Sequence, residues 1–457
     1  MSSTAPTLGD NQHSAMFFWP TPDRPVIDRG DGIYLWDQDG KRYIDACSGP
    51  QTANIGHGNA RVREAMTAQA EKVSYAFRSH FLNEPAESLA REIVGLCPDG
   101  LDQVFFTSGG SEAVEACIKL ARQYALAIGE ATRYKVISRL PSYHGTTLGA
   151  LSLTGDPAGF SMFAPMMVNM PKIPAPFCRY RPAGETEDEA ALRFANALET
   201  EIIHQGPETV LAFIMEPIGG AATAALTAPD IYYTRVRDIC DEYDVLLIFD
   251  EVMSGAGRSG RYLSAEHWNV TPDLVALAKG LASGYIPLGA CLTSSKIIGT
   301  VEDAGGFMHG HTYSASPIAC AVGRAVLAEH LDNDLIGNAA RMGAVLKGRL
   351  EGLLNEFEFI GEIRGRGLLL GFDVISDRQT GHALPAELDA HLRLSQEAYD
   401  RGLIIYSRRT LGGAKGDNFL ISPPLIVTEE QIDEIMVLLI ASLRAFAPTA
   451  RAAINAD

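Results

Sequence analysis

The strongest constraint on the fold is an alternation of short apolar runs with longer amphipathic stretches between about residues 101 and 290. The apolar runs consist almost entirely of Val, Ile, Leu and Phe, which is typical of strands buried on both faces of a mostly parallel sheet. Six such strands are predicted, at residues 103–106, 134–138, 210–215, 245–249, 274–277 and 288–293. Residues 111–128 and 229–244 carry apolar side chains at helical spacing, so the sequence predicts an α/β domain with helices flanking the sheet.

The pattern changes after about residue 315. Helices are predicted at 317–331, 338–357, 385–401 and 428–446, with strands at 363–374, 403–406 and 418–421. Near the N-terminus, Asp39-Gly40 between two apolar runs is a strong hairpin signal. We therefore predict a large domain at 73–315 and a smaller α+β domain at 316–457, with which an N-terminal segment at 1–72 packs. Residues 160–184 contain five prolines and are expected to form an irregular loop.

Composition disfavours several classes of function. Lys and Arg number 38 against 56 Asp and Glu, and the net charge of −18 argues against binding to nucleic acid or to anionic membranes. The longest unbroken apolar runs, 435–441 and 210–215, fall short of the roughly 18 residues that a transmembrane helix needs. No basic start of a secretory signal is present, so a cytoplasmic protein without membrane contact is expected. The seven cysteines lack a Cys-x-x-Cys pair, and His309 and His311 have no acid or cysteine at ligand spacing, so neither a disulfide framework nor a metal is expected.

Gly109, Gly110 and Ser111 form the junction between a predicted strand and a predicted helix. Ser111 is a suitable N-cap, and Glu112 falls in the first helical turn. Such a junction presents unpaired backbone N–H groups at the positive end of the helix dipole, which suits a phosphate. Taken alone, these residues are explained equally well as an ordinary capped turn.

A second glycine-rich stretch, residues 255–260, matches G-x-G-x-x-G, and Asp273 follows at about the distance of a ribose-binding acid. In a dinucleotide site the glycines directly follow a strand and open a helix. Here they begin six positions after residue 249 and lead into residues 261–264, where no helical period starts. We interpret the stretch as a flexible loop and expect no nicotinamide dinucleotide.

Two charged residues close buried strands, Asp250 after the run 245–249 and Lys279 after the run 274–277. Ligands bind at the carboxyl ends of strands in open α/β sheets, so both residues are candidates for a site. A free lysine, with a pKa near 10.4, is deprotonated in only about one molecule in a few thousand at pH 7, so an amine nucleophile needs a lowered pKa or a covalent imine. A salt bridge between the two residues is the simpler alternative.

Together these features match the three attachments that pyridoxal phosphate needs, namely a phosphate cup, an acid for the pyridinium nitrogen and a lysine for a Schiff base. Tyr143 adds an aromatic ring after the strand predicted at 134–138. At this point the chain resembles the class III pyridoxal-phosphate aminotransferases of fold type I, the group of the ω-amino acid and ω-amine transaminases. Six ordered motifs carry the resemblance, at residues 108–113, 143–145, 216–217, 249–252, 278–280 and 310–313.

The resemblance implies a large cofactor domain, a smaller α+β domain and a set of site residues. The implied cofactor-binding residues are Gly110, Ser111, Tyr143, His144, Glu216, Asp250, Val252, Lys279 and Thr312, with Lys279 and Asp250 as the catalytic residues. Within this set the glycine and serine bind the phosphate, the tyrosine and valine cover the two ring faces, and the aspartate binds the ring nitrogen. The lysine forms the Schiff base, and Thr312 reaches the phosphate of the neighbouring subunit, which requires a homodimer with the active site at the interface. Glu216 is similar to an active-site glutamate of the family, and a simple strand-end acid is the alternative.

The implied reaction moves an amino group from an amine or ω-amino acid to a keto acid such as pyruvate or 2-oxoglutarate by a ping-pong mechanism. Lys279 transfers the substrate proton in this mechanism. Epimerisation or decarboxylation of an amino acid on the same scaffold uses the same Lys279 and Asp250 and stays an alternative. A nicotinamide dehydrogenase and a non-catalytic relative are the remaining alternatives.

The substrate residues are less well marked. Family members that act on ω-amines commonly carry a bulky aromatic after the Ser-Gly near the N-terminus, where this chain has Pro50 and Gln51. An arginine often follows the strand that matches 403–406, and we hypothesise that Arg409, rather than Arg408, binds the substrate carboxylate. The candidates for an amine pocket, or else for core or dimer contacts, are Phe17, Phe18, Trp19, Tyr75, Phe77 and Phe81.

Overall fold

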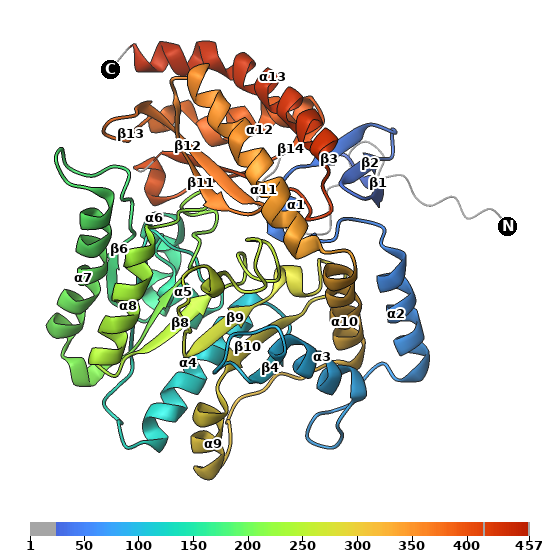
Figure 1. Ribbon diagram of the computed structural model, residues 1–457, viewed down its shortest axis with the longest axis vertical. Helices are drawn as coiled ribbons and strands as arrows, with labels where there is room; N and C mark the ends of the chain where they lie inside the picture. Colours follow the sequence, from blue (N-terminus) through green and yellow to red (C-terminus); the bar gives the residue numbers. More distant parts are fainter. Residues whose placement is uncertain (1–23, 415, 456–457) are drawn as a thin grey trace.

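A seven-stranded sheet forms the centre of the larger part of the chain, as Figure 1 shows for the computed structural model, which describes residues 24–414 and 416–455. In spatial order its strands are β4 (Gln103–Thr107), β10 (Gly289–Thr293), β9 (Leu274–Leu277), β8 (Leu246–Asp250), β7 (Val210–Met215), β5 (Lys135–Leu140) and β6 (Lys172–Pro174). Neighbouring strands are parallel except at β10, which is antiparallel to both β4 and β9. The predicted α/β fold with a mostly parallel sheet is confirmed.

Both faces of this sheet are covered by helices. Because successive strand residues point to opposite faces, Phe105 packs with helix α4 (Gly110–Ala127) on one face. Its neighbour Phe106 belongs to the core cluster on the other face, with α7 (Glu187–Gln205) and α8 (Asp230–Glu242). This double burial explains the nearly continuous apolar sequence of the strands.

The predicted irregular region at 160–184 contains one short strand. β6 is the edge of the sheet and pairs with β5 alone, which is why Pro174 is tolerated at its end. The rest of this region is irregular apart from a short helical turn at Phe160 and a 3₁₀ helix at Ser161–Met166.

A second, antiparallel sheet lies in the C-terminal part. It contains β11 (Ile360–Arg366), β12 (Leu369–Asp377), β16 (Asp417–Ile421) and β15 (Tyr406–Arg409), and β13 (His382–Ala383) pairs with β12. The prediction of one strand at 363–374 was wrong, because the chain turns back at Gly367. This glycine has a φ of +56°, and an added Cβ would lie 2.4 Å from the carbonyl carbon of Ser259, so the turn requires glycine.

The N-terminal segment forms a third sheet with a strand from near the end of the chain. Its order is β1 (Ile27–Asp31), β2 (Tyr34–Asp37), β3 (Arg42–Asp45) and β14 (Leu403–Ile404). The predicted hairpin at Asp39-Gly40 is confirmed, since β2 and β3 are antiparallel and Gly40 has a φ of +83°. β3 pairs in parallel with β14, which joins the two ends of the chain. The domain boundaries at 72 and 315 stay predictions.

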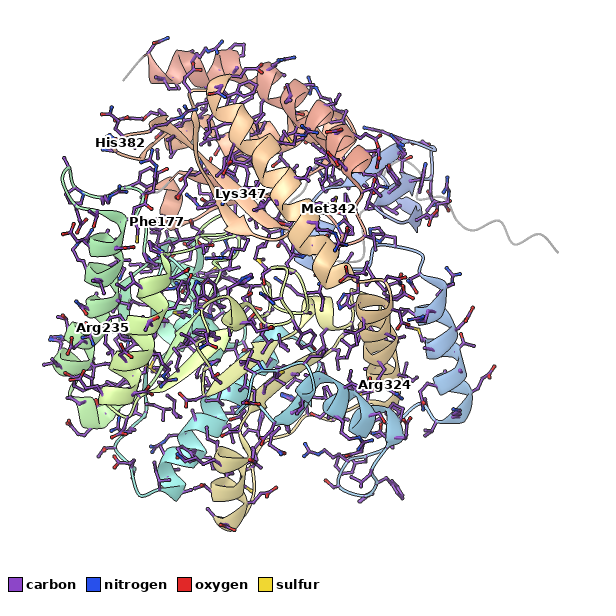
Figure 2. All side chains as sticks on the ribbon, viewed as in Figure 1. Phe177, Arg235, Arg324, Met342, Lys347 and His382 are labelled. Atoms are coloured by element: carbon purple, nitrogen blue, oxygen red, sulfur yellow. The ribbon has the colours of Figure 1, made fainter. Side chains whose placement is uncertain are left out.

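The remaining helices are α1 (Ser48–Gln51), α2 (Ala60–Lys72), α3 (Glu84–Val94), α5 (Leu148–Leu153), α6 (Pro157–Phe160), α9 (Ser295–Asp303), α10 (Pro317–Asp332), α11 (Leu335–Gly352), α12 (Ala390–Asp400) and α13 (Glu429–Ile454). Helix α10 packs against α2 and α3, and its Arg324 forms ion pairs with Glu84 and Glu92 of α3 at 2.9 and 2.7 Å (Figure 2). Likewise, Arg235 of α8 pairs with Glu199 of α7 at 2.7 Å.

Helix α13 is long and apolar enough to cross a membrane by length and composition alone, although its longest unbroken apolar run, residues 435–441, is short. It packs into the core through Ile432, Ile435, Leu439, Leu443 and Phe446. A core helix of a soluble protein meets the same criterion. The expectation of a cytoplasmic protein without membrane contact therefore stays a prediction.

Candidate active site

The predicted motifs meet at one edge of the seven-stranded sheet. Strands β4, β5, β7, β8 and β9 run in the same direction, so their carboxyl ends lie side by side. Gly110 follows β4, Tyr143 follows β5, Glu216 follows β7, Asp250 is the last residue of β8, and Lys279 follows β9. Residues that are far apart in the sequence thereby surround one cavity.

This cavity has a volume of about 500 Å³. Of the nine implied cofactor residues, it is lined by all but Thr312, namely Gly110, Ser111, Tyr143, His144, Glu216, Asp250, Val252 and Lys279. Other wall residues include Pro50, Thr52, Met253, Ile286, Tyr406 and Arg408. The mixture of a few polar groups with apolar and aromatic walls is typical of a small-molecule site.

The N-terminus of α4 gives one end of the cavity an affinity for anions. The first N–H groups of a helix have no partner within the helix, and the dipole is positive there. Gly110 is required at this position, because an added Cβ would lie 2.7 Å from Cγ1 of Val252. Ser111 Oγ accepts a hydrogen bond from the N–H of Thr146 at 3.1 Å, which ties the loop after β5 to the helix.

Asp250 is held by two hydrogen bonds. Its Oδ1 accepts from the N–H of Val252 at 3.1 Å, and its Oδ2 lies 2.8 Å from Nδ1 of His144. Both side chains are buried. The carboxylate is therefore fixed in orientation at the wall of the cavity.

Two buried polar atoms at this wall, Nε2 of His144 and Oε2 of Glu216, have no hydrogen-bond partner among the residues that the structure describes, although Oε2 lies 3.9 Å from Nη2 of Arg139. The other carboxylate oxygen of Glu216 accepts from the N–H of Gly220 at 3.0 Å. Burial raises the pKa of Glu216, although the nearby His144 and Arg139 oppose this rise. Unpaired buried polar atoms are rare in folded proteins, so they mark the wall as a surface for a polar ligand.

Lys279 is prepared for chemistry by its surroundings. Removal of its ammonium from water lowers the pKa of Lys279 to about 8, although Asp250 and Glu216 favour the charged form. With that pKa, about a tenth of the amine is neutral at pH 7. The residue also has a φ of +47°, a left-handed conformation that is unfavourable for a residue with a Cβ.

These features fit pyridoxal phosphate. One cavity combines an anion-binding helix end, an aromatic ring at Tyr143, an apolar side chain at Val252, a fixed carboxylate and an amine with a lowered pKa. Oε2 of Glu216 and Nε2 of His144, which have no hydrogen-bond partner among the described residues, can form hydrogen bonds with the same ligand.

The hypothesis that Arg409 binds the substrate carboxylate does not fit the structure. The guanidinium of Arg409 donates to Asp417 at 2.9 and 3.0 Å and to Asp389 at 2.9 Å, and the residue is not part of the cavity wall. Arg408 lines the cavity instead. Its Nη2 also forms an ion pair, with Oδ2 of the buried Asp156 at 3.2 Å, so what distinguishes the two arginines is their place relative to the cavity wall and not the presence of an acidic partner.

The reason is strand β15, which extends to Arg409, whereas the predicted strand ended at residue 406. Successive side chains of a strand point to opposite sides. Tyr406 and Arg408 therefore share the side that faces the cavity, and the guanidinium of Arg408 lies 4.9 Å from the ring centroid of Tyr143. The two-residue period of a strand over 406–409 is the signal that would have found this residue.

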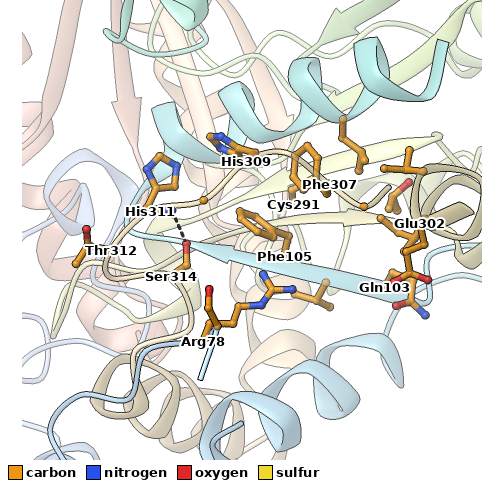
Figure 3. Close-up of a pocket in the computed structure, with 18 of the residues that line it drawn as sticks. Arg78, Gln103, Phe105, Cys291, Glu302, Phe307, His309, His311, Thr312 and Ser314 are labelled. Carbon is orange, nitrogen blue, oxygen red and sulfur yellow. Dashed lines mark hydrogen bonds between the residues drawn. The ribbon is translucent and has the colours of Figure 1, made fainter. Parts of the chain in front are cut away.

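Besides Arg409, two described residues of the predicted site, Gln51 and Thr312, do not line this cavity. Gln51 is buried, and its side-chain amide has no hydrogen-bond partner among the described residues, but only its neighbours Pro50 and Thr52 line the wall. Thr312 borders a separate cavity of about 650 Å³, shown in Figure 3, whose wall includes Arg78, His309 and His311. Trp19, like Phe17 and Phe18, lies outside the described residues. Within the described ranges, no group of three or more His, Cys, Asp or Glu side chains is placed to hold a metal ion.

The wall residues Met253 and Ile286 were not anticipated. They lie in loops with no motif of their own, and only the fold brings them to the site.

Known proteins resemble this chain over nearly its whole length. The family described as aminotransferase class-III matches residues 20–443. An uncharacterised aminotransferase of Bacillus subtilis (strain 168), YodT, is 41% identical over 414 residues, which cover 90% of this chain and 93% of that protein. The mitochondrial gamma-aminobutyrate transaminase 1 of Oryza sativa subsp. indica is 34% identical over 437 residues, which cover 92% of this chain and 81% of that protein.

A solved structure agrees with this relationship. The crystal structure of a PLP-bound amine transaminase from an uncultivated Pseudomonas species is 34% identical, with a TM-score of 0.88 over 96% of this chain and 99% of that chain. The resemblance inferred from the motifs is confirmed. The chain belongs to the class III aminotransferases, fold type I enzymes that use pyridoxal phosphate to transfer amino groups.

Proposed function

We propose that this aminotransferase takes its amino group from an amine or ω-amino acid with an extended, largely apolar body and passes it to a keto acid such as pyruvate or 2-oxoglutarate. The observation that carries the proposal is the single cavity that unites Lys279, Asp250 and the N-terminus of α4 with an apolar wall and one arginine, Arg408. Relatives named as an amine transaminase and a gamma-aminobutyrate transaminase support this donor class.

Five residues of the cavity have a proposed role toward the cofactor. Gly110 and Ser111 hold the phosphate, Tyr143 and Val252 enclose the ring, and Asp250 binds the ring nitrogen. When bound, pyridoxal phosphate supplies an electron sink for the carbon that carries the amino group.

Lys279 is proposed to attach the cofactor through its Nζ and then to act as acid and base. The lowered pKa of about 8 gives it enough neutral amine near pH 7 to accept a proton from the substrate carbon. The resulting ammonium at Nζ of Lys279 would then donate this proton to the cofactor carbon that takes over the amino group. Glu216 and Asp250 stabilise that charged form, since both carboxyl groups favour a cation at Lys279.

Arg408 is proposed to bind the carboxylate of the keto acid. A guanidinium presents paired donors that match a carboxylate. Met253, Ile286 and Pro50 offer apolar surface in the same cavity. A donor with an apolar body is therefore expected to react faster than a small dicarboxylate such as glutamate.

We further propose that the active enzyme is a homodimer in which Thr312 reaches the partner's phosphate site. Three large apolar side chains near this residue are exposed, namely Tyr75, Phe77 and Tyr313, and the same two segments of the chain also expose Phe81, Leu82 and Met308. The hydroxyl of Tyr75 donates to the carbonyl oxygen of Thr312 at 2.9 Å, which places the threonine within this patch. Apolar patches of this kind mark protein interfaces. Light scattering should give twice the chain mass, and Phe81→Glu should give monomers with weaker cofactor binding.

The absorption spectrum of the purified enzyme tests the reaction directly. A visible band should decrease when an amine donor is added without a keto acid, and pyruvate or 2-oxoglutarate should restore it. The Lys279→Ala variant is the control and should not show this cycle at a catalytic rate. A band that no amine converts would refute transamination by this site.

A further inference from the structure

The glycine-rich stretch at 255–260 forms a loop of turns, as the sequence predicted, and this loop is mostly buried. Arg258 is completely buried and is among the largest fully buried side chains of the described residues. Gly257 and Gly260 have φ values of +86° and +85°, and an added Cβ at Gly260 would lie 3.0 Å from Cβ of Ala340 on α11. The glycines let the chain turn against this helix and direct Arg258 into the protein.

The guanidinium of Arg258 connects three separate segments of the chain. It donates to the carbonyl oxygens of Leu368 (3.2 Å), Ser422 (3.1 Å) and Pro423, to Oγ of Ser48 (3.0 Å) and to Oδ1 of Asn54 (2.7 Å). All these acceptors are neutral oxygen atoms. Burial lowers the pKa of Arg258, although the charge of the Asp45 carboxylate favours the cation. A buried cation whose hydrogen bonds all go to neutral groups is costly to retain, which indicates a role for its position.

One of these contacts leads to the reactive lysine. The amide Nδ2 of Asn54 donates to the carbonyl oxygen of Ala256 at 3.0 Å, and an added Cβ at Gly280 would lie only 2.2 Å from this Nδ2. The next residue, Ile55, donates its N–H to Oγ of Ser283 at 2.9 Å. Asn54 therefore packs directly on the turn that contains Lys279.

The turn needs such support. Lys279 has a φ of +47° and Ser283 a φ of +50°, and the N–H of Ser283 donates to the carbonyl oxygen of Lys279 at 2.9 Å. Left-handed conformations of residues with a Cβ persist only where their surroundings hold them. The same arginine also holds Ser48, so both ends of the segment that carries the cavity wall at Pro50 and Thr52 are fixed.

We propose that Arg258 is a positioning residue of the transamination reaction, which acts through Asn54 to hold the Lys279 turn in its reactive conformation. This inference rests on Lys279 as the reactive lysine of the proposed function. The substitution Arg258→Lys keeps the charge but replaces the planar guanidinium by one compact ammonium group, which is unable to donate hydrogen bonds to all three segments at once. The Lys279 turn then relaxes, and water reaches its amine.

Arg258→Lys tests this without relying on activity alone. In the protein freed of cofactor, reductive methylation is measured by peptide mass spectrometry at Lys279 and at the exposed Lys296 across a range of pH values. The pH midpoint of methylation at Lys279 should rise by about one unit in Arg258→Lys, because a hydrated amine is a stronger base. At pH 7.5 this rise corresponds to about 10-fold slower methylation of Lys279, with the rate at Lys296 as the reference. In the enzyme with cofactor, kcat should fall about 10-fold while the keto-acid KM stays within about twofold.

A double-mutant cycle separates positioning from general stability. Asn54→Ala removes the side chain that connects Arg258 to the Lys279 turn but leaves the other hydrogen bonds of Arg258. This variant therefore also tests the proposal if Arg258→Lys does not fold. Each single change should slow the methylation of Lys279, and the double variant should be no slower than the slower single variant, because both break the same path. Arg378→Lys is the matched control, since Arg378 also binds carbonyl oxygens, those of Ile360 and Phe357, but has no contact with the turn.

The expected outcome is an altered Lys279 profile in both single variants and an unchanged profile in the control. Equal effects of Arg258→Lys and Arg378→Lys, or multiplying effects in the double variant, would overturn the positioning role. If the unmodified enzyme does not attach pyridoxal phosphate at Lys279, the proposed function fails. If it does attach the cofactor there and Arg258→Lys leaves the Lys279 profile unchanged, only the present inference fails.

Discussion

The adjacent residues Arg408 and Arg409 allow a sharp test of the substrate assignment. Replacing Arg408 by Met keeps an apolar side chain against the ring of Tyr143 but removes the cation from the cavity. A hydrogen bond to a charged group contributes about 1.5–3 kcal/mol. The kcat/KM for a keto acid should therefore fall roughly 10- to 150-fold in Arg408→Met, while that for an amine without a carboxylate should change much less.

Arg409→Met should affect stability and leave the keto-acid KM unchanged. Burial of Asp417 favours its neutral form, but hydrogen bonds from His391 and Arg409 outweigh this and lower the pKa of Asp417 from 3.8 to about 2. The difference of about 1.8 pKa units corresponds to about 2.5 kcal/mol for all partners together. Loss of Arg409 should thus destabilise the protein by roughly 1–2 kcal/mol, since the contacts with His391 remain.

Steady-state kinetics with pyruvate and 2-oxoglutarate at a fixed amine concentration, together with urea unfolding of both variants, provide the assay. The reasoning is refuted if Arg409→Met raises the keto-acid KM as much as Arg408→Met does. It is also refuted if Arg408→Met binds both keto acids as tightly as the unmodified enzyme.

Three further predictions concern the cofactor site and the response to pH. Reductive methylation of Lys279 in the cofactor-free protein should have its midpoint near pH 8, because the neutral amine forms above a pKa of about 8; a midpoint near the ordinary 10.5 would contradict the burial argument. Gly110→Val should weaken pyridoxal phosphate binding at least about 10-fold in a spectrophotometric titration, because its Cβ meets Val252 at 2.7 Å, whereas Gly348→Val on the exposed face of α11 should bind normally, because an added Cβ there has no neighbour within 4 Å and the residue lies outside the cavity. The stabilisation that Asp417 contributes is complete above its unfolded pKa of 3.8 and is lost as the pH falls through its folded pKa of about 2. The difference in urea unfolding midpoint between the unmodified protein and Asp417→Asn should therefore narrow between about pH 4 and about pH 2. A constant difference would exclude the ion pairs of Asp417 as the source of this stabilisation.

Local patterns were sufficient for six of the seven strands of the central sheet and for the strand-end residues that line the cavity. The predicted strand at 210–215 agrees with β7 at both ends, since a strand buried on both faces needs an unbroken apolar sequence. Lys279 and Asp250 were found for a related reason. A charged residue directly after such a strand lies at the edge of the sheet where ligands bind.

Other features depended on contacts between distant segments. Gly367 looked like part of a continuous strand, and only the approach of Ser259 shows why the chain turns there. Arg408 and Arg409 have the same chemistry, and their roles separate only because β15 directs them to opposite sides.

The sequence by itself determined the α/β class, the family and the residues at the strand ends, because each of these depends on neighbouring residues and on the two-residue and 3.6-residue periods. The tertiary structure alone decided which arginine faces the cavity and why Arg258 is buried beside Asn54, a residue about two hundred positions away along the chain. The physical reason is that a hydrogen bond between remote segments depends on the position of both partners in space, and no local pattern of residue types records that position.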